Sequence, residues 1–280
     1  MKTFSCAVWI GTVTIICFSC GQSSKTDQPA ESKAFVVARD NFFQSLKKPD
    51  TVSAIIASAV TMFDSTIVHH PEAYVDYTSN DIKAAGNLGI YLSDLNYCIL
   101  LRQGPKARKF FEASYELSKA MGAEKKTLEF LMERYASTLA QNDSLGKAFG
   151  ELFRNSTLDL KGTERERLAG VVIAGYQIEN LHLVLSVLES LPSEPNEDQT
   201  RFKNHLLDYI LAQQGRWEMV FNFLQANSDP MDPDRNPNYP FFNNALRELI
   251  TVYRSISPND YHTDELKEKV TAIRSKLISS

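Results

Sequence analysis

The sequence predicts an all-α protein, and three observations support this fold class. Residues that share one helix face recur at helical spacing between 105 and 121, namely Phe110, Phe111, Ser114, Leu117 and Met121. No segment sustains a period of two, and no Asn-Gly or Asp-Gly pair marks a hairpin. None of the 11 prolines lies between 106 and 191, so that interval lacks the strongest helix breaker. We therefore expect about ten helices.

Turn and capping signals divide the chain into these helices. A Gly-Pro pair at 104–105 marks the end of one helix and the start of the next. Capping-box spacing at Thr163 and Glu166, and again at Asn196 and Gln199, marks two further starts. The predicted helices are roughly 32–47, 51–66, 80–102, 105–121, 124–141, 143–156, 163–191, 197–212, 216–227, 241–255 and 263–278.

The predicted helices form a single domain, 32–280. Their connections are short apart from the Pro-rich loop 228–240, so successive helices should pack as antiparallel hairpins. Such hairpins can build either an extended array or one large helical bundle. The sequence leaves both arrangements open.

Two of the hairpins share a repeat-like pattern. In one, Gly lies at the turn with an aromatic residue two positions later; its residues are Leu207, Leu211, Gly215, Trp217, Val220 and Leu224. The other hairpin carries Leu88, Gly89, Ala107, Phe111 and Ser114, and its first helix is several residues longer. The pattern resembles the tetratricopeptide repeat, although no strict 34-residue period runs through the chain. The resemblance implies a tetratricopeptide-like array.

The amino end has the form of an export signal. Lys2 precedes an apolar stretch from Phe4 to Phe18. At about 15 residues, this stretch is short for a membrane span, which needs ~20. We therefore expect residues 1–19 to be a signal peptide.

A cysteine follows the apolar stretch. Ser19, Cys20 and Gly21 precede a polar run, and this arrangement resembles the lipobox of bacterial lipoproteins, with Cys17 where that family usually has Leu. The resemblance implies that Cys20 becomes the acylated first residue, with at least two acyl chains to hold it in a membrane. Residues 20–31 would form a tether. By the same resemblance, Gly21 is compatible with sorting to an outer membrane, on its periplasmic or its surface face. An uncleaved anchor and an ordinary signal peptide are the alternatives.

A second resemblance covers most of the mature chain. The run from Asn87 to Tyr97 contains Asn-Leu-Gly-Ile-Tyr and Asp-Leu-x-Tyr, and Ile178, Glu179 and Leu181 follow later. This pattern is similar to a group of helical bacterial lipoproteins of unknown function. It implies location and fold only.

The four cysteines have separate predicted fates. Cys6 and Cys17 leave with the signal peptide, Cys20 carries lipid, and Cys98 is the one remaining thiol. An intramolecular disulfide is therefore excluded from the mature chain. Because Cys98 lies in an apolar helical pattern, we expect it to be a small buried core residue.

Glu179 and His182 have the Glu-x-x-His spacing of carboxylate-bridged di-iron bundles. Such a site needs a second copy of the motif, and the sequence has none. The surrounding helix is apolar on nearly all sides, so the alternative is a hydrogen-bonded polar pair inside the core. We predict no metal site here.

Asp94 shares a helical stripe with Asn87, Tyr91 and Cys98. A buried carboxylate needs a partner or a raised pKa, and either can mark a functional site. The alternative is that Asp94 caps a neighbouring turn or pairs with an arginine.

The loop 228–240 places Asp232 and Asp234 at alternate positions, as a calcium loop does. Pro237 stands where such loops have glycine, and Asx-rich turns have this composition without metal. Whether calcium binds is left open, but Asp232, Asp234 and Tyr239 are candidate partner contacts.

No catalytic or nucleotide-binding motif is present. The pair His69 and His70 lies at a helix boundary and is predicted to be an exposed turn. The chain has 30 basic and 34 acidic residues, and its net charge of −4 argues against nucleic-acid binding. We expect a lipid-anchored, non-enzymatic binding or scaffold protein of the cell envelope, without a cofactor and with a protein or peptide partner.

Two alternative functions each depend on a particular arrangement of side chains. A glycan- or nutrient-capture protein would expose Trp217, Tyr239 and Phe241 in one groove, because sugars stack on aromatic faces. A metal-dependent enzyme would join Asp94, Glu179 and His182 in one accessible pocket.

Overall fold

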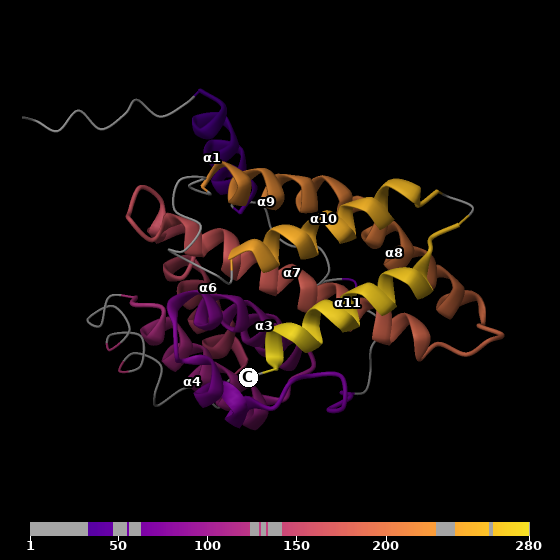
Figure 1. The fold of residues 1–280 in the computed structure, drawn as a ribbon. Helices are drawn as coiled ribbons and strands as arrows, with labels where there is room; N and C mark the ends of the chain where they lie inside the picture. Colours follow the sequence, from indigo (N-terminus) through magenta and orange to yellow (C-terminus); the bar gives the residue numbers. More distant parts are fainter. Residues whose placement is uncertain are drawn as a thin grey trace, which may run out of the picture. The chain divides into compact units, whose positions relative to one another are not determined.

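The computed structural model describes residues 33–46, 55, 63–123, 129, 133, 142–227, 239–257 and 260–279 (Figure 1). These residues belong to one compact unit, Lys33–Ser280. The residues of the predicted signal peptide and tether, including Cys20, lie outside the described residues, and so do Asp232 and Asp234. What the sequence predicts for them stays a prediction.

Helices make up most of the described chain. They are α1 (Lys33–Ser45), α3 (Asp81–Leu100), α4 (Gly104–Ala120), α6 (Asn142–Asn155), α7 (Glu166–Glu189), α8 (Glu197–Ala212), α9 (Gln214–Ala226), α10 (Tyr239–Ser255) and α11 (Thr263–Ile278). Two 3-10 helices are added, η1 (Pro71–Tyr77) and η2 (Leu158–Leu160). Within the described residues, β pairing is confined to an isolated bridge between Ser257 and Asp260. The predicted all-α fold is confirmed.

The predicted helix 51–66 is wrong where its end is described, because residues 63–66 are not helical. The Asp64 carboxylate accepts hydrogen bonds from the backbone N–H and the hydroxyl of Thr66, at 2.8 and 2.7 Å. A local side-chain bond of this kind competes with helical backbone bonds. We call residues 63–70 the strap, since they run irregularly along α3 before η1 begins.

One of the two predicted capping boxes is present. Asn196 and Gln199 exchange side-chain-to-backbone bonds of 2.9 Å at the start of α8. The prediction at Thr163 and Glu166 is wrong, because α7 begins at Glu166 itself. The Thr163 hydroxyl instead donates to the Leu160 carbonyl at the end of η2, 2.8 Å away.

Helices α3 and α7 pack backbone to backbone at two glycines. A Cβ on Gly89 would collide with the carbonyl oxygen of Val172, and a Cβ on Gly175 would collide with the carbonyl oxygen of Gly86. Only glycine therefore fits this approach. The close crossing fixes the position of every side chain that these two helices direct at each other.

Helix α7 is the central element of the bundle. It contacts α3, α8, α9, α10 and α11 (Figure 1). By length and composition it could cross a membrane, but 78% of its apolar window is buried inside the protein, as in a core helix. In a linear array each hairpin contacts only its neighbours. A central helix with five helical partners matches the large-bundle alternative better.

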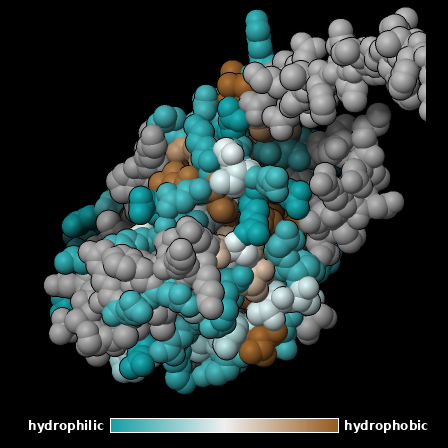
Figure 2. All heavy atoms as spheres, turned by 90° about the vertical axis from the view of Figure 1, so that its left-hand side faces the viewer, coloured by the Kyte–Doolittle hydropathy of each residue, from teal (hydrophilic) through white to brown (hydrophobic). Residues whose placement is uncertain are grey.

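The face turned to the viewer in Figure 2 carries mostly hydrophilic side chains where it is described. Hydrophobic residues form small, separate patches there. Val37 and Val75, each more than half exposed, are the large hydrophobic side chains that protrude from the described part of the chain. Isolated apolar residues of this kind are normal on a protein surface and need no partner.

Candidate functional site: a buried acid pair and a surface groove

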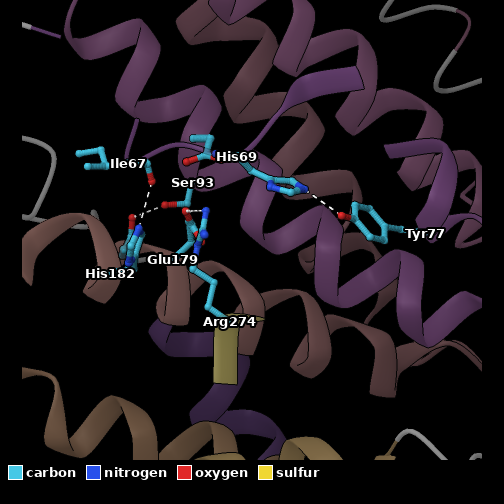
Figure 3. A network of polar contacts seen from close by, with 9 residues as sticks. Ile67, His69, Tyr77, Ser93, Glu179, His182 and Arg274 are labelled. Carbon is cyan, nitrogen blue, oxygen red and sulfur yellow. Dashed lines mark hydrogen bonds and ion pairs between the residues drawn. The ribbon is translucent and has the colours of Figure 1, made fainter. Parts of the chain in front are cut away.

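Three helices bring charged side chains together in the core. Asp94 comes from α3, Glu179 from α7 and Arg274 from α11 (Figure 3). Both carboxyl groups are fully buried. Arg274 holds Glu179 through two bonds, Nε to Oε2 at 2.5 Å and Nη2 to Oε1 at 2.9 Å. This fork geometry is the strongest form of a charged hydrogen bond in proteins.

Asp94 is the second acid of the pair. Its Oδ2 accepts a hydrogen bond of 2.9 Å from the backbone N–H of His69, while its Oδ1 is buried without a hydrogen-bonded partner. Burial, and after it the negative charge of Glu179, raises the pKa of Asp94 well above its ordinary value. The raised pKa favours the protonated form of Asp94, which can donate to the Glu179 carboxylate. Such a bond would satisfy the otherwise unpaired atom.

Two histidines lie beside the acid pair, His69 from the strap and His182 from α7. His69 Nε2 lies 2.8 Å from the hydroxyl of Tyr77 (Figure 3). This hydroxyl in turn donates to the carbonyl of Ile278 at 3.0 Å. His182 Nε2 lies 3.0 Å from the carbonyl of Ile67. Because a carbonyl only accepts, this nitrogen of His182 carries a proton. The prediction that His69 is an exposed turn is wrong, because its ring is held inside this network.

Both histidines are neutral at pH 7. Burial, followed by the positive charge of Arg274, lowers the pKa of His69 to about 4. Burial also lowers the pKa of His182, and the opposing charge of Glu179 does not reverse the shift.

Neutral polar contacts extend the network between the same helices. The Ser93 hydroxyl donates to Oδ1 of Asn180 at 2.8 Å, which joins α3 to α7. Asn87 Nδ2 donates to the carbonyl of Leu277 at 3.0 Å, which joins α3 to α11. The arrangement is a structural tie between three helices and the strap.

Only part of this site is predicted by the sequence. Asp94 accepts a bond from the turn at His69, in agreement with the capping alternative. Arg274 was missed, and it pairs with Glu179 instead. A signal for it exists: Arg274 lies four residues after Val270 and three before Leu277, on the buried stripe of α11.

The accessible pocket that an enzyme would need is not formed by these residues. Asp94 and Glu179 do meet, but neither exposes its carboxyl group. His182, one turn further along α7, is half-buried and bound to the strap. Across the described residues, no group of three His, Cys, Asp or Glu side chains could hold a metal ion.

Trp217 lies in the core, where its ring packs at 6.2 Å from that of Tyr253. It is 1% exposed, so this position does not suit a contact with a sugar or a partner. Phe241 is half-buried against Phe242, and the side chain of Tyr239 is outside the described residues. The structure does not gather these aromatic residues on one surface.

The predicted burial of Cys98 is confirmed, because this residue is a buried free thiol.

The molecule has a surface groove of about 660 Å³ that the sequence did not indicate. It lies where the end of α7, the middle of α8 and the start of α11 meet, at the right of Figure 1. Its apolar side chains are Leu185, Leu188, Leu207 and Tyr261. Its charged side chains are Glu189, Lys203, Asp260, Asp264, Glu265 and Lys267. We call it the α7–α8–α11 groove.

Comparison with known proteins finds no match to the chain among family models, curated proteins or solved structures. The resemblances to bacterial lipoproteins and to tetratricopeptide hairpins therefore stay predictions. Function has to be argued from the buried tie and the groove.

Proposed function

We propose that this chain is an exported, lipid-anchored helical binding protein, and that the α7–α8–α11 groove receives its protein or peptide partner. The anchor rests on the sequence around Cys20, where an apolar export signal meets a polar tether. The binding role rests on the groove. The sequence places the protein in the cell envelope, with an outer membrane as the favoured site.

One observation supports the binding role: the carboxyl groups of the acid pair are closed to solvent, whereas the charged groups of the groove are open to it. The carboxyl groups of the acid pair are fully buried, and Glu179 is held by Arg274 through two hydrogen bonds. The groove instead offers apolar and charged side chains to solvent within one hollow. Protein interfaces combine an apolar part with polar groups at its rim, and the groove offers side chains of both kinds.

The two alternative functions lack the arrangements that would favour them. The enzyme alternative needs solvent at Asp94 and Glu179, which are fully buried. The glycan-capture alternative needs Trp217 at a surface, and Trp217 is in the core. We therefore infer a non-enzymatic binding role that needs no cofactor.

The anchor is tested by metabolic labelling with radioactive palmitate. We expect the full chain to incorporate the label and Cys20→Ala to lose it, because the acylated thiol is then absent. Cys98→Ala is the matched control, since it removes the buried thiol and leaves Cys20 in place. Label retained in Cys20→Ala would contradict the anchor.

A further inference from the structure

We propose that the α7–α8–α11 groove binds a basic segment of a partner protein in which lysine or arginine residues are interspersed with apolar ones. The proposal rests on the binding role argued above and adds the chemistry of the partner. Charge, apolar area and the backbone at the start of α11 each support it.

The charge of the groove is negative. Lys267 forms an ion pair with Glu189, so these two charges offset each other. Asp260, Asp264 and Glu265 then face the single charge of Lys203. Asp260 and Glu265 have side chains that are half or more exposed. His262 also lines the groove, with Nε2 3.5 Å from Asp260 Oδ2 and Nδ1 3.9 Å from Glu265 Oε2, and both carboxylates keep exposed area that a cation from outside can reach. Complementary charge of this kind steers a basic partner and selects against an acidic one.

The groove is also lined by apolar side chains. Leu185 and Leu207 are buried, while Leu188 and Tyr261 are half-buried and keep apolar area in contact with solvent. Covering this area releases about 25 cal/mol per Å². A partner of positive charge alone would leave it uncovered. The groove therefore favours a segment that also carries apolar side chains.

The start of α11 favours a peptide over a compact cation. Its N-cap residue, His262, adopts a left-handed backbone conformation, with φ of 45°, and its side chain makes no capping bond. The first intrahelical bond is donated by Leu266 to the His262 carbonyl. The backbone N–H groups that precede Leu266 in α11 can donate to an acceptor from a partner. The adjacent carboxylates of Asp264 and Glu265 repel an acceptor that carries negative charge. A main-chain carbonyl of a peptide is a neutral acceptor that meets both conditions.

The test uses three fluorescent ten-residue peptides and the full chain in detergent, with empty micelles as the blank. One peptide alternates Lys with Leu, one alternates Glu with Leu, and one alternates Lys with Ser. Fluorescence anisotropy gives each dissociation constant. We expect the Lys–Leu peptide to bind at least tenfold more tightly than either of the others, and to weaken as salt is added.

The groove-neutralised variant carries Asp260→Asn, Asp264→Asn and Glu265→Gln. We expect it to bind the Lys–Leu peptide at least tenfold more weakly. Equal binding by this variant, or tighter binding of the Glu–Leu peptide, would overturn the proposal. Equal binding of the Lys–Ser peptide would overturn its apolar half.

The matched control carries Glu197→Gln, Asp198→Asn and Glu268→Gln. It also removes three carboxylates, two of them in the first turn of a helix, but none of them lines the groove. We expect its affinity to stay within twofold of the unmodified chain. An equal loss in both variants would mean that net charge, and not the groove, binds the peptide, and this too would overturn the proposal.

Failure of this inference is distinguishable from failure of the proposed function. Photo-crosslinking in cells from position 261 identifies whichever segment occupies the groove. A crosslinked partner whose segment is acidic or uncharged overturns the inference and keeps the binding role. No crosslinked partner at all would count against the binding role itself.

Discussion

At the scale of single residues, the raised pKa of Asp94 favours a proton on this buried acid. Its Oδ2 accepts from the backbone N–H of His69, whereas Oδ1 has no partner unless the protonated acid donates to Glu179. Glu179 in turn neutralises Arg274, whose side chain is 14% exposed. The contribution of each side chain to stability therefore depends on the protonation state of its neighbour. Substitutions of Asp94 and Glu179 should differ sharply in their effect on the free energy of unfolding.

Asp94→Asn should be tolerated. The Asn side chain has an oxygen to accept from His69 and an N–H to donate to Glu179, so it reproduces the protonated acid. We expect the free energy of unfolding at pH 7, measured by urea titration with circular dichroism, to be no lower than that of the unmodified chain. A loss above about 2 kcal/mol would show that Asp94 is ionised in the fold.

Glu179→Gln is the contrasting substitution. It removes the counter-charge of Arg274 in the core, and breaking one partner of a buried ion pair costs about 3–5 kcal/mol. The same urea titration measures it, and Glu268→Gln, an exposed substitution outside the network, serves as the control. Equal stability of the Glu179 and Glu268 variants would contradict the role of the ion pair.

Part of this residue-scale site could be predicted from the sequence. Asp94 was identified because a carboxylate on an apolar helical stripe is costly unless it is satisfied, and Glu179 was identified from its Glu-x-x-His spacing with His182. Their partner Arg274 was not, because α11 carries many other charges and the order in which helices pack is not encoded locally. The groove was missed for the same reason, since its walls come from three segments up to about 80 residues apart.

At the scale of elements, the crossing of α3 and α7 depends on glycine. Helical glycines normally cost about 1 kcal/mol relative to alanine. Gly89 and Gly175 are retained where the opposite backbone leaves no room for a Cβ. Periodicity predicted these helices to within a few residues, but it could not show that they touch. It also missed the strap, where Asp64 diverts the chain from a helix.

Gly175→Ala should destabilise the protein. The new Cβ meets the carbonyl of Gly86, and backbone cannot move aside as a side chain can, so we expect a loss of about 3 kcal/mol or more in the free energy of unfolding. Gly150→Ala in α6 is the matched control, because nothing lies within 4 Å of its Cβ position. It should gain about 0.5–1 kcal/mol. Equal effects would contradict the close crossing.

At the scale of the whole molecule, the described residues form one bundle around α7. The pKa shift of Asp94 and those of the two histidines change the stability of this bundle with pH in opposite directions. Asp94 has a raised pKa, so its contribution to stability is complete below pH 3.8 and is lost as the pH rises through its folded value. His69 and His182 have lowered pKa values, so their contribution is complete above pH 6.5 and is lost as the pH falls, for His69 towards 4. The two trends oppose each other between pH 4 and 6.5. Glu179 and Arg274 face all three groups.

Because Asp94 and the two histidines change stability with pH in opposite directions, Asp94→Asn should alter the pH profile of stability. Without the titration of Asp94, the histidines act unopposed, so the free energy of unfolding should fall more steeply from pH 6.5 to 4 than in the unmodified chain. Urea titrations at half-unit pH intervals measure the two slopes. Parallel profiles would mean that Asp94 has no raised pKa in the fold.

The central claim is that the groove, and not the buried acid pair, is where this protein acts. The direct measurement places a photo-reactive phenylalanine derivative at Tyr261 in cells and compares two variants. We predict that crosslinking to the partner is retained in the Asp94→Asn variant and lost in the groove-neutralised variant. Retention in the groove-neutralised variant, with loss in a folded Asp94→Asn protein, would contradict it.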